Sequence, residues 1–175
     1  MTTLPESKTR ELIWRYPEQE GQPFILWDEG VKAGWLQFHE QPLESSGEFR
    51  GRRLVFRYSA KLYPRVTVCS EEDSPHIVAE FLPCWTGGGW VSFDSGARYR
   101  WRKAHIWGGG WCFIRMDQKS QVCLSQEAGP LIQGGRVSIC SGAADLPETP
   151  VLLLLAWFLR IMDFEMLVEG IFRAG

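Results

Sequence analysis

Arginines at every second position are the residues of this sequence best placed to do chemistry. Arg98, Arg100 and Arg102 alternate with Tyr99 and Trp101. Alternate side chains of a β-strand point to the same face, so this spacing predicts three guanidinium groups on one face and two aromatic rings on the other. A guanidinium donates two parallel hydrogen bonds to a phosphate or carboxylate. The spacing therefore makes this strand face a candidate site for a lipid headgroup or another phosphate, beside the more common case of an ordinary solvated face that pairs with acidic neighbours.

A second basic stretch lies earlier in the chain, at residues 50–65. It has no acidic residue and contains Arg50, Arg52, Arg53, Arg57, Lys61 and Arg65. A basic group near an anionic membrane surface contributes about 1 kcal/mol to binding, so a joined patch would favour such a surface. The candidate headgroup-binding residues are Arg52, Arg53, Arg57, Arg98, Arg100 and Arg102. The alternative is an ordinary solvated face that pairs with acidic neighbours, and the fold decides whether the two stretches adjoin.

Catalytic, metal and cofactor sites have little support. The histidines, His39, His76 and His105, lie far apart, and no HExxH, GxSxG or P-loop pattern occurs. The glycine runs at residues 87–89 and 108–110 are typical of turns. We expect no catalytic residue, no metal and no cofactor, and we favour a non-enzymatic protein over an enzyme.

The cysteines and the N-terminus bear on the cellular compartment. None of the five cysteines belongs to a CxxC pair, and most lie among strand-forming residues, which favours buried free thiols. The alternative is a disulfide between Cys112 and Cys123 across a hairpin near residues 117–118. Residues 1–10 are polar and lack the apolar stretch of a secretory signal. Together these features predict a cytoplasmic location, with peripheral membrane attachment as an option.

Composition and turn spacing predict a mainly β domain. The 175 residues carry a net charge of −2 and 45% hydrophobic residues, which excludes a disordered chain and disfavours a basic nucleic-acid binder. Glycine and proline clusters recur at intervals of about ten residues, as in antiparallel sandwiches and barrels. Strands are predicted at residues 12–16, 23–27, 31–38, 54–58, 62–69, 77–84, 89–93, 97–103, 111–116, 121–125 and 136–140, with a looser segment at 40–51.

The C-terminal segment is the exception, because it predicts a helix without a polar face. Thr149 is a suitable N-cap and Pro150 a suitable first helical residue, and residues 151–159 are all apolar. Such a helix is enclosed by protein or by a membrane, and a membrane span needs about 20 apolar residues. Enclosure by the protein is favoured over a tail anchor, and a closed antiparallel barrel of about twelve strands around the helix would supply it. The predicted organisation is a flexible N-terminus (1–10), the barrel with its helix (11–163, helix 150–163) and a tail (164–175) that could continue the helix.

This pattern resembles the tubby C-terminal-like superfamily, which includes the LURP-one-related proteins and the phospholipid scramblases. The resemblance is carried by the helix at residues 151–162, the Tyr-Arg-Trp-Arg run at 99–102, the stretch 106–111 that follows it, and the hairpin of 111–116 with 121–125. It implies a twelve-stranded barrel around a hydrophobic C-terminal helix. The sequence lacks an acidic loop of EF-hand type, so the calcium dependence of scramblases does not carry over.

Three functions follow as hypotheses. The first is a non-enzymatic, tubby-like or scramblase-like barrel that binds phospholipid or phosphoinositide headgroups or acts as a scaffold. The second is a small-molecule-binding or enzymatic barrel with a pocket at its mouth, lined by convergent polar groups. The third is a protein partner or self-association through the C-terminal tail, whose apolar residues Phe164, Leu167, Val168, Ile171 and Phe172 recur at helical spacing.

Overall fold

The computed structural model describes residues 10–39, 44–59, 63–72, 76–84, 87–103, 110–116, 121–126 and 134–173. Within these ranges, the side chains of residues 121, 123–126 and 163–173 are not described. The predicted N-terminal segment, apart from Arg10, and the side chains of the predicted tail therefore lie outside the described part of the chain.

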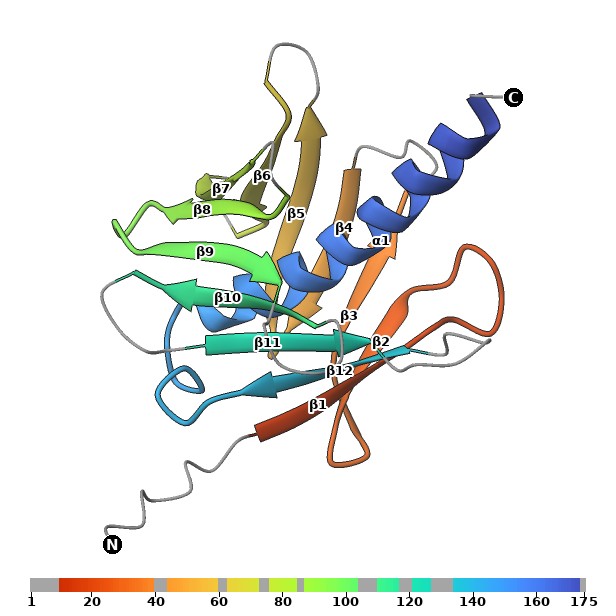
Figure 1. Ribbon diagram of the computed structural model, residues 1–175. Helices are drawn as coiled ribbons and strands as arrows, with labels where there is room; N and C mark the ends of the chain where they lie inside the picture. The colour runs from red at the N-terminus through yellow and green to blue at the C-terminus, as the bar shows by residue number, and fades with distance from the viewer. Residues whose placement is uncertain are drawn as a thin grey trace, which may run out of the picture.

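Twelve strands precede a single helix in the chain (Figure 1). The strands are β1 (Arg10–Arg15), β2 (Phe24–Asp28), β3 (Val31–Phe38), β4 (Glu44–Phe49), β5 (Arg52–Ser59), β6 (Arg65–Ser70), β7 (Ile77–Pro83), β8 (Gly89–Phe93), β9 (Arg98–Lys103), β10 (Trp111–Arg115), β11 (Gln121–Gln126) and β12 (Gly134–Ile139). The helix is α1 (Thr149–Arg173). The predicted mainly β class with one C-terminal helix is confirmed.

Each strand pairs antiparallel with its neighbours in the chain, and β1 pairs with both β2 and β12. The order of pairing thus returns to its starting strand, and no described strand is left with an unpaired long edge. Strands β6, β7 and β8 separate β5 from β9. The two basic stretches therefore lie on different parts of the sheet and form no joined patch.

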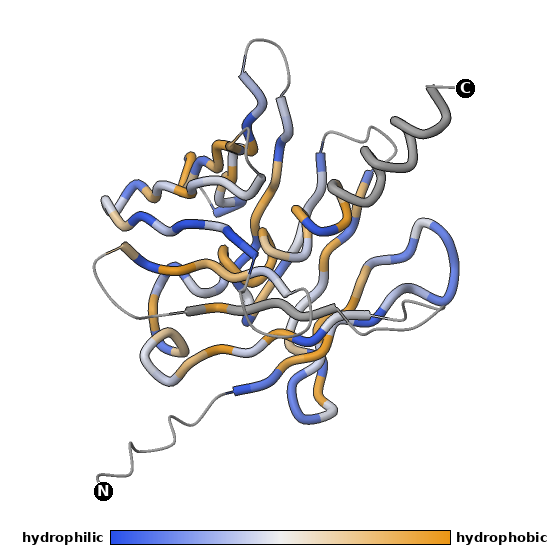
Figure 2. Tube along the Cα trace, in the orientation of Figure 1, coloured by the Kyte–Doolittle hydropathy of each residue, from blue (hydrophilic) through white to orange (hydrophobic). Residues whose placement is uncertain are grey.

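The sheet packs its inner residues against α1. Residues 151–158 are at most 2% exposed, and both Leu153 and Trp157 lie among them. Along the strands, hydrophobic residues alternate with hydrophilic ones, as the tube in Figure 2 shows. The prediction that protein encloses the apolar helix is confirmed. Within the described residues, no helix combines the length and apolar character that a membrane span requires.

Stacked aromatic rings fix the helix against the strands. The ring of Trp157 stacks on Trp14 of β1, with a centroid separation of 5.5 Å and an interplanar angle of 9°. Phe158 stacks on Phe38 of β3 and on Phe56 of β5, each at 5.5 Å. Such pairs add about 0.5–1.5 kcal/mol each to the free energy of area burial. Successive helix residues thus pack against neighbouring strands between β1 and β5.

Strand β4 corrects the prediction of a looser segment at residues 40–51. Its sequence, ESSGEF, has few strand-forming residues, yet every residue of β4 pairs with β5. A Cβ atom at Gly47 would lie 3.1 Å from a side-chain carbon of Leu36 and 3.4 Å from Cδ1 of Leu154. The inner face of β4 carries small residues at Ser45 and Gly47, and at Gly47 the side chains of Leu36 and Leu154 occupy the space that a larger residue would fill.

The helix begins one residue earlier than predicted. The N–H of Leu152 donates to the carbonyl oxygen of Glu148 at 3.0 Å, so Glu148 is the N-cap residue and Thr149 is the first helical residue. The Thr149 hydroxyl donates instead to the carbonyl oxygen of Ala143. At its other end the helix runs past residue 163 to Arg173.

The cysteines divide into two classes. Cys112 is disulfide-bonded, and the register of β10 with β11 places it directly opposite Cys123. Directly opposed residues of an antiparallel pair have Cβ atoms within about 4.5–5.5 Å, close to the range of a disulfide. Cys69 and Cys84 are free thiols, and they and Cys140 are half-buried. The prediction of free thiols is therefore wrong for Cys112, and thiol state no longer supports the predicted location.

Candidate anion-binding surface

The outer face of β9 carries the three alternating arginines. Arg98, Arg100 and Arg102 are exposed, while Tyr99 and Trp101 are 1% and 2% exposed and belong to the core. The alternation predicted from the sequence is therefore present. The tube in Figure 2 is hydrophilic along this strand.

An indole ring lies between two of these arginines. Trp90 of β8 is directly opposite Arg100 in the β8–β9 register. The guanidinium carbon of Arg100 lies 5.4 Å from the centroid of the Trp90 ring, and that of Arg98 lies 5.9 Å from it. Cation–π contacts at exposed sites contribute about 0.5–1 kcal/mol. The ring orders both guanidinium groups without neutralising their charge.

No acidic residue stands beside the arginines in the sheet. Their cross-strand partners are Trp90 and Ser92 on β8 and Cys112 and Ile114 on β10. Among the described residues, the five ion pairs involve Arg10, Arg53, Arg57, Arg65 and His76, and none involves Arg98, Arg100 or Arg102. We call Trp90, Arg98, Arg100 and Arg102 the β8–β9 surface. Its positive charge is available to a ligand.

The arginines of β5 are placed differently. Arg53 and Arg57 lie directly opposite Glu48 and Glu44 of β4, and their Nε atoms are 2.9 and 2.8 Å from the carboxylates. The hydrogen bond to the carboxylate, assisted by its charge, raises the pKa of each arginine above its ordinary value. Arg52 donates to the carbonyl oxygen of Pro147 at 2.9 Å. All three β5 candidates thus have a partner within the protein.

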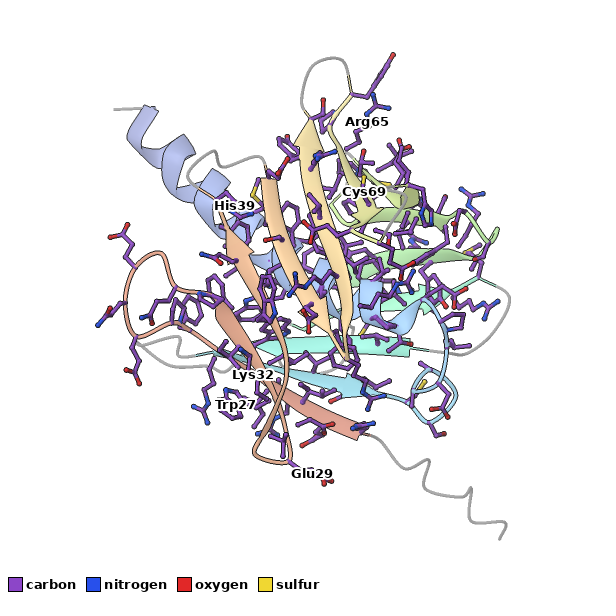
Figure 3. The ribbon with its side chains drawn as sticks, turned by 180° about the vertical axis from the view of Figure 1, so that it is seen from behind. Trp27, Glu29, Lys32, His39, Arg65 and Cys69 are labelled. Carbon is purple, nitrogen blue, oxygen red and sulfur yellow. The ribbon has the colours of Figure 1, made fainter. Side chains whose placement is uncertain are left out.

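Two further polar residues outside the β8–β9 surface also have partners within the protein. Arg65, at the start of β6, extends away from the sheet in Figure 3 and its Nη1 lies 3.6 Å from Oε1 of Glu80. His39, at the end of β3 in the same view, has its Nε2 3.1 Å from the Ser46 hydroxyl. His39 and Ser46 lie at the distance of a base–nucleophile pair, but no third side chain among the described residues makes a hydrogen bond to the imidazole that would orient it. In the described part of the chain no group of three metal-ligating side chains occurs.

A cavity of about 250 Å³ lies beside α1 where the helix passes residues 158–162. Its lining includes Tyr58, Val66, Phe81, Trp101, Phe158 and Met162. These side chains are apolar or aromatic, so the cavity lacks the convergent polar groups expected of an enzymatic pocket. It fits a small apolar molecule better than a polar substrate.

Comparison with known proteins finds no relative from which a function could be transferred. No family model, no curated protein and no solved structure matches this chain. The functional argument therefore rests on the residues themselves.

Proposed function

We propose that this chain is a non-enzymatic, tubby-like barrel of twelve strands around its C-terminal helix, and that it binds anionic phospholipid headgroups. The β8–β9 surface would hold the headgroups, and the protein would act peripherally at a membrane. The observation that carries the proposal is the set of three exposed arginines on one strand, ordered by Trp90 and without an acidic cross-strand neighbour.

The binding free energy expected for three arginines is large enough to direct the protein to an anionic membrane. Three basic groups at about 1 kcal/mol each would favour an anionic membrane over a neutral one by about a hundredfold. The fork of each guanidinium suits phosphate oxygens, which accept two hydrogen bonds at once. The β4–β5 face offers no such gain, because Glu44 and Glu48 already occupy its guanidinium groups.

Vesicle co-sedimentation tests the proposal. The wild-type chain is mixed at low ionic strength with phosphatidylcholine vesicles alone or with added phosphatidylserine or phosphoinositide. The double variant Arg100→Gln/Arg102→Gln should lose about thirtyfold in partitioning to the anionic vesicles, since two groups of about 1 kcal/mol are removed. The matched control is Arg53→Gln/Arg57→Gln, which changes the net charge by the same amount and should bind like wild type.

Two outcomes would contradict the lipid proposal. One is an absence of binding to every anionic vesicle at low salt, where screening is weakest. The other is an equal loss in the two double variants, which would show that overall charge rather than the β8–β9 surface governs the attraction. A phosphoinositide preference over phosphatidylserine would indicate recognition of the headgroup phosphates.

A second candidate function is binding of a small apolar molecule in the 250 Å³ cavity beside α1. Apolar cavities of about 150 Å³ already bind molecules of the size of benzene. Titration with a fluorescent apolar probe should show one site per chain, and Val66→Phe should remove that site by filling the cavity. An unchanged titration would exclude this cavity as the binding site.

A further inference from the structure

The apolar cavity beside α1 extends from the core of the protein to its surface. Among its lining residues, Phe81, Trp101 and Phe158 are at most 3% exposed. Two other lining residues are exposed, Pro64 directly before β6 and Pro83 at the end of β7. The cavity therefore runs from an opening bordered by these two prolines to the apolar side chains of α1.

Two exposed apolar side chains adjoin this opening. Tyr63 directly precedes Pro64 in the chain and is 80% exposed, and Leu82 directly precedes Pro83 and is 46% exposed. A single exposed apolar residue is ordinary, but these two belong to separate parts of the chain and border the same apolar cavity. Apolar surface therefore continues from the cavity to the outside of the protein.

The volume of the cavity limits the length of the hydrocarbon chain that fits. The cavity measures about 250 Å³, and an apolar cavity of about 150 Å³ holds benzene. In proportion, this cavity accommodates roughly ten carbon atoms. Its lining is apolar, and burying a charged group there without a partner would be costly. A charged group of the ligand must therefore stay at the opening, in contact with water.

The charged residues described near the opening are mainly basic. Gly88 lines the cavity and lies against β9, since a Cβ atom on it would be 3.5 Å from the Cα atom of Arg102. Arg102 and Lys103 are both exposed at this end of β9. Arg65 adjoins the lining at the start of β6, where Glu80 balances its charge at 3.6 Å. These four charged side chains sum to a positive charge, which favours an anionic group at the opening.

We propose that this cavity binds a fatty acid, with its hydrocarbon chain against α1 and its carboxylate in water at the opening near Arg102. The inference rests on the second candidate function, apolar binding in the same cavity, and names the class of ligand. A neutral chain would fill the cavity without using the positive charge, and a short carboxylate would leave the cavity partly empty. Chain length and charge should therefore each contribute to affinity.

Calorimetric titration of the wild-type chain with octanoate, decanoate and dodecanoate tests the chain length. Each methylene group transferred from water into an apolar site raises affinity about fourfold. Decanoate should therefore bind about fifteenfold more tightly than octanoate. Dodecanoate is longer than the cavity and should gain less than about fourfold over decanoate. Equal gains at the two steps would overturn the proposal, because the cavity would not limit the chain.

Titration with decanol, which has the same chain without the charge, tests the role of Arg102. The ratio of decanoate affinity to decanol affinity should fall about threefold in Arg102→Gln, as expected for the loss of one exposed charge pair. Taking the ratio cancels any effect of the substitution on the cavity itself. The matched control is Arg53→Gln, which removes the same charge from β5 and should leave the ratio unchanged.

Photolabelling locates the bound chain in the wild-type protein and needs no variant. Decanoate with a diazirine at the end of its chain should label Phe158, Leu159 or Met162 of α1, which line the cavity. An excess of unlabelled decanoate should prevent the reaction. Labelling confined to Tyr63 or Leu82 would place the chain outside the cavity and overturn the proposal.

The outcomes separate this inference from the two earlier proposals. Binding of decanol, with the same affinity ratio in wild type and Arg102→Gln, would overturn the fatty-acid inference and leave apolar binding in the cavity intact. Failure of both decanol and decanoate to bind at millimolar concentration would overturn both. Neither result bears on binding to vesicles, because these titrations contain no bilayer.

Discussion

The helix α1 makes different kinds of contact at the two ends of the sheet. At the polar end, where α1 begins, Arg52, Ser95 and Thr149 make hydrogen bonds to the chain around Glu148. At the apolar end, residues 157–162 meet aromatic and aliphatic side chains, and the cavity beside them is apolar. One end is organised by directional polar contacts and the other by ring packing.

This difference follows from what each part of a helix needs. The first turn has N–H groups without partners inside the helix, so polar neighbours favour a defined starting point. Further along, the helix bonds are satisfied internally and only the side chains remain to be packed. The polar end therefore sets where the helix lies, and the apolar end supplies most of the free energy of burial.

The largest effect should come from Trp157 at the apolar end. Trp157→Ala removes the stack on Trp14 and leaves a cavity, at a cost of about 3–5 kcal/mol in the free energy of unfolding. Trp157→Phe keeps an aromatic ring and leaves a smaller cavity, so it should cost less than Trp157→Ala. Urea unfolding measures both. A loss below about 1 kcal/mol for the Ala variant would contradict the division between the two ends.

A smaller effect is expected at the polar end from Thr149. Thr149→Val keeps the shape of the side chain but removes the donor to the carbonyl oxygen of Ala143, at a cost of about 1–3 kcal/mol. The same substitution at Thr67, a half-buried strand position, should change stability by less than about 0.5 kcal/mol. Equal effects at the two positions would show that the hydrogen bond at the helix start is dispensable.

Arg52 should contribute less than Thr149, since it is partly exposed. Arg52→Met keeps the length of the stem and removes the hydrogen bond to Pro147, at a cost of about 1 kcal/mol. The control Arg65→Met breaks an exposed ion pair and should cost no more than about 0.5 kcal/mol. Thermal unfolding of the two variants would separate anchoring of the helix start from ordinary surface pairing.

The smallest effect is a pH dependence at the apolar end. Burial raises the pKa of Tyr16 above its ordinary value of 10.0, with Arg160 acting in the opposite direction. A raised folded pKa stabilises the fold below the unfolded pKa, and this contribution is lost as pH rises through the folded value. Urea unfolding between about pH 9 and 11 should therefore show a steeper alkaline loss in wild type than in Tyr16→Phe. Parallel curves would show that Tyr16 is not responsible.

The helix was the part of the fold most accessible to prediction from sequence. Nine consecutive apolar residues without a polar face predicted enclosure, and the structure buries them. Strand β4 could not be found in the same way, because its small polar residues resemble a loop until the space taken by Leu154 is known. The N-cap differed by one residue, because threonine is a preferred N-cap residue and glutamate is not, and only the hydrogen bonds of the folded chain place the N-cap at Glu148.

The sequence predicted which arginines of the candidate site are exposed, but not which arginines form ion pairs within the protein. The alternation along β9 predicted which residues are exposed. The ion pairs of Arg53 and Arg57 depend on Glu48 and Glu44, which lie in the unpredicted strand, so they could not be predicted from the sequence alone. Trp90 lies beside the arginines because of the β8–β9 register. The hydrogen bond to Glu148 comes from Ser95, which is 53 residues away in the chain. Neither contact can be read from the sequence.

The position of α1 after all twelve strands has a consequence for how the chain must fold. During synthesis every strand leaves the ribosome before the helix that fills the space between them. At that stage the strands lack the helix that completes their core. Strand β1 cannot pair with its second neighbour until β12 has been synthesised. Contacts so distant in sequence slow folding and prolong exposure of apolar surface. Nascent chains halted before residue 149 should therefore be captured by chaperones far more readily than chains released in full.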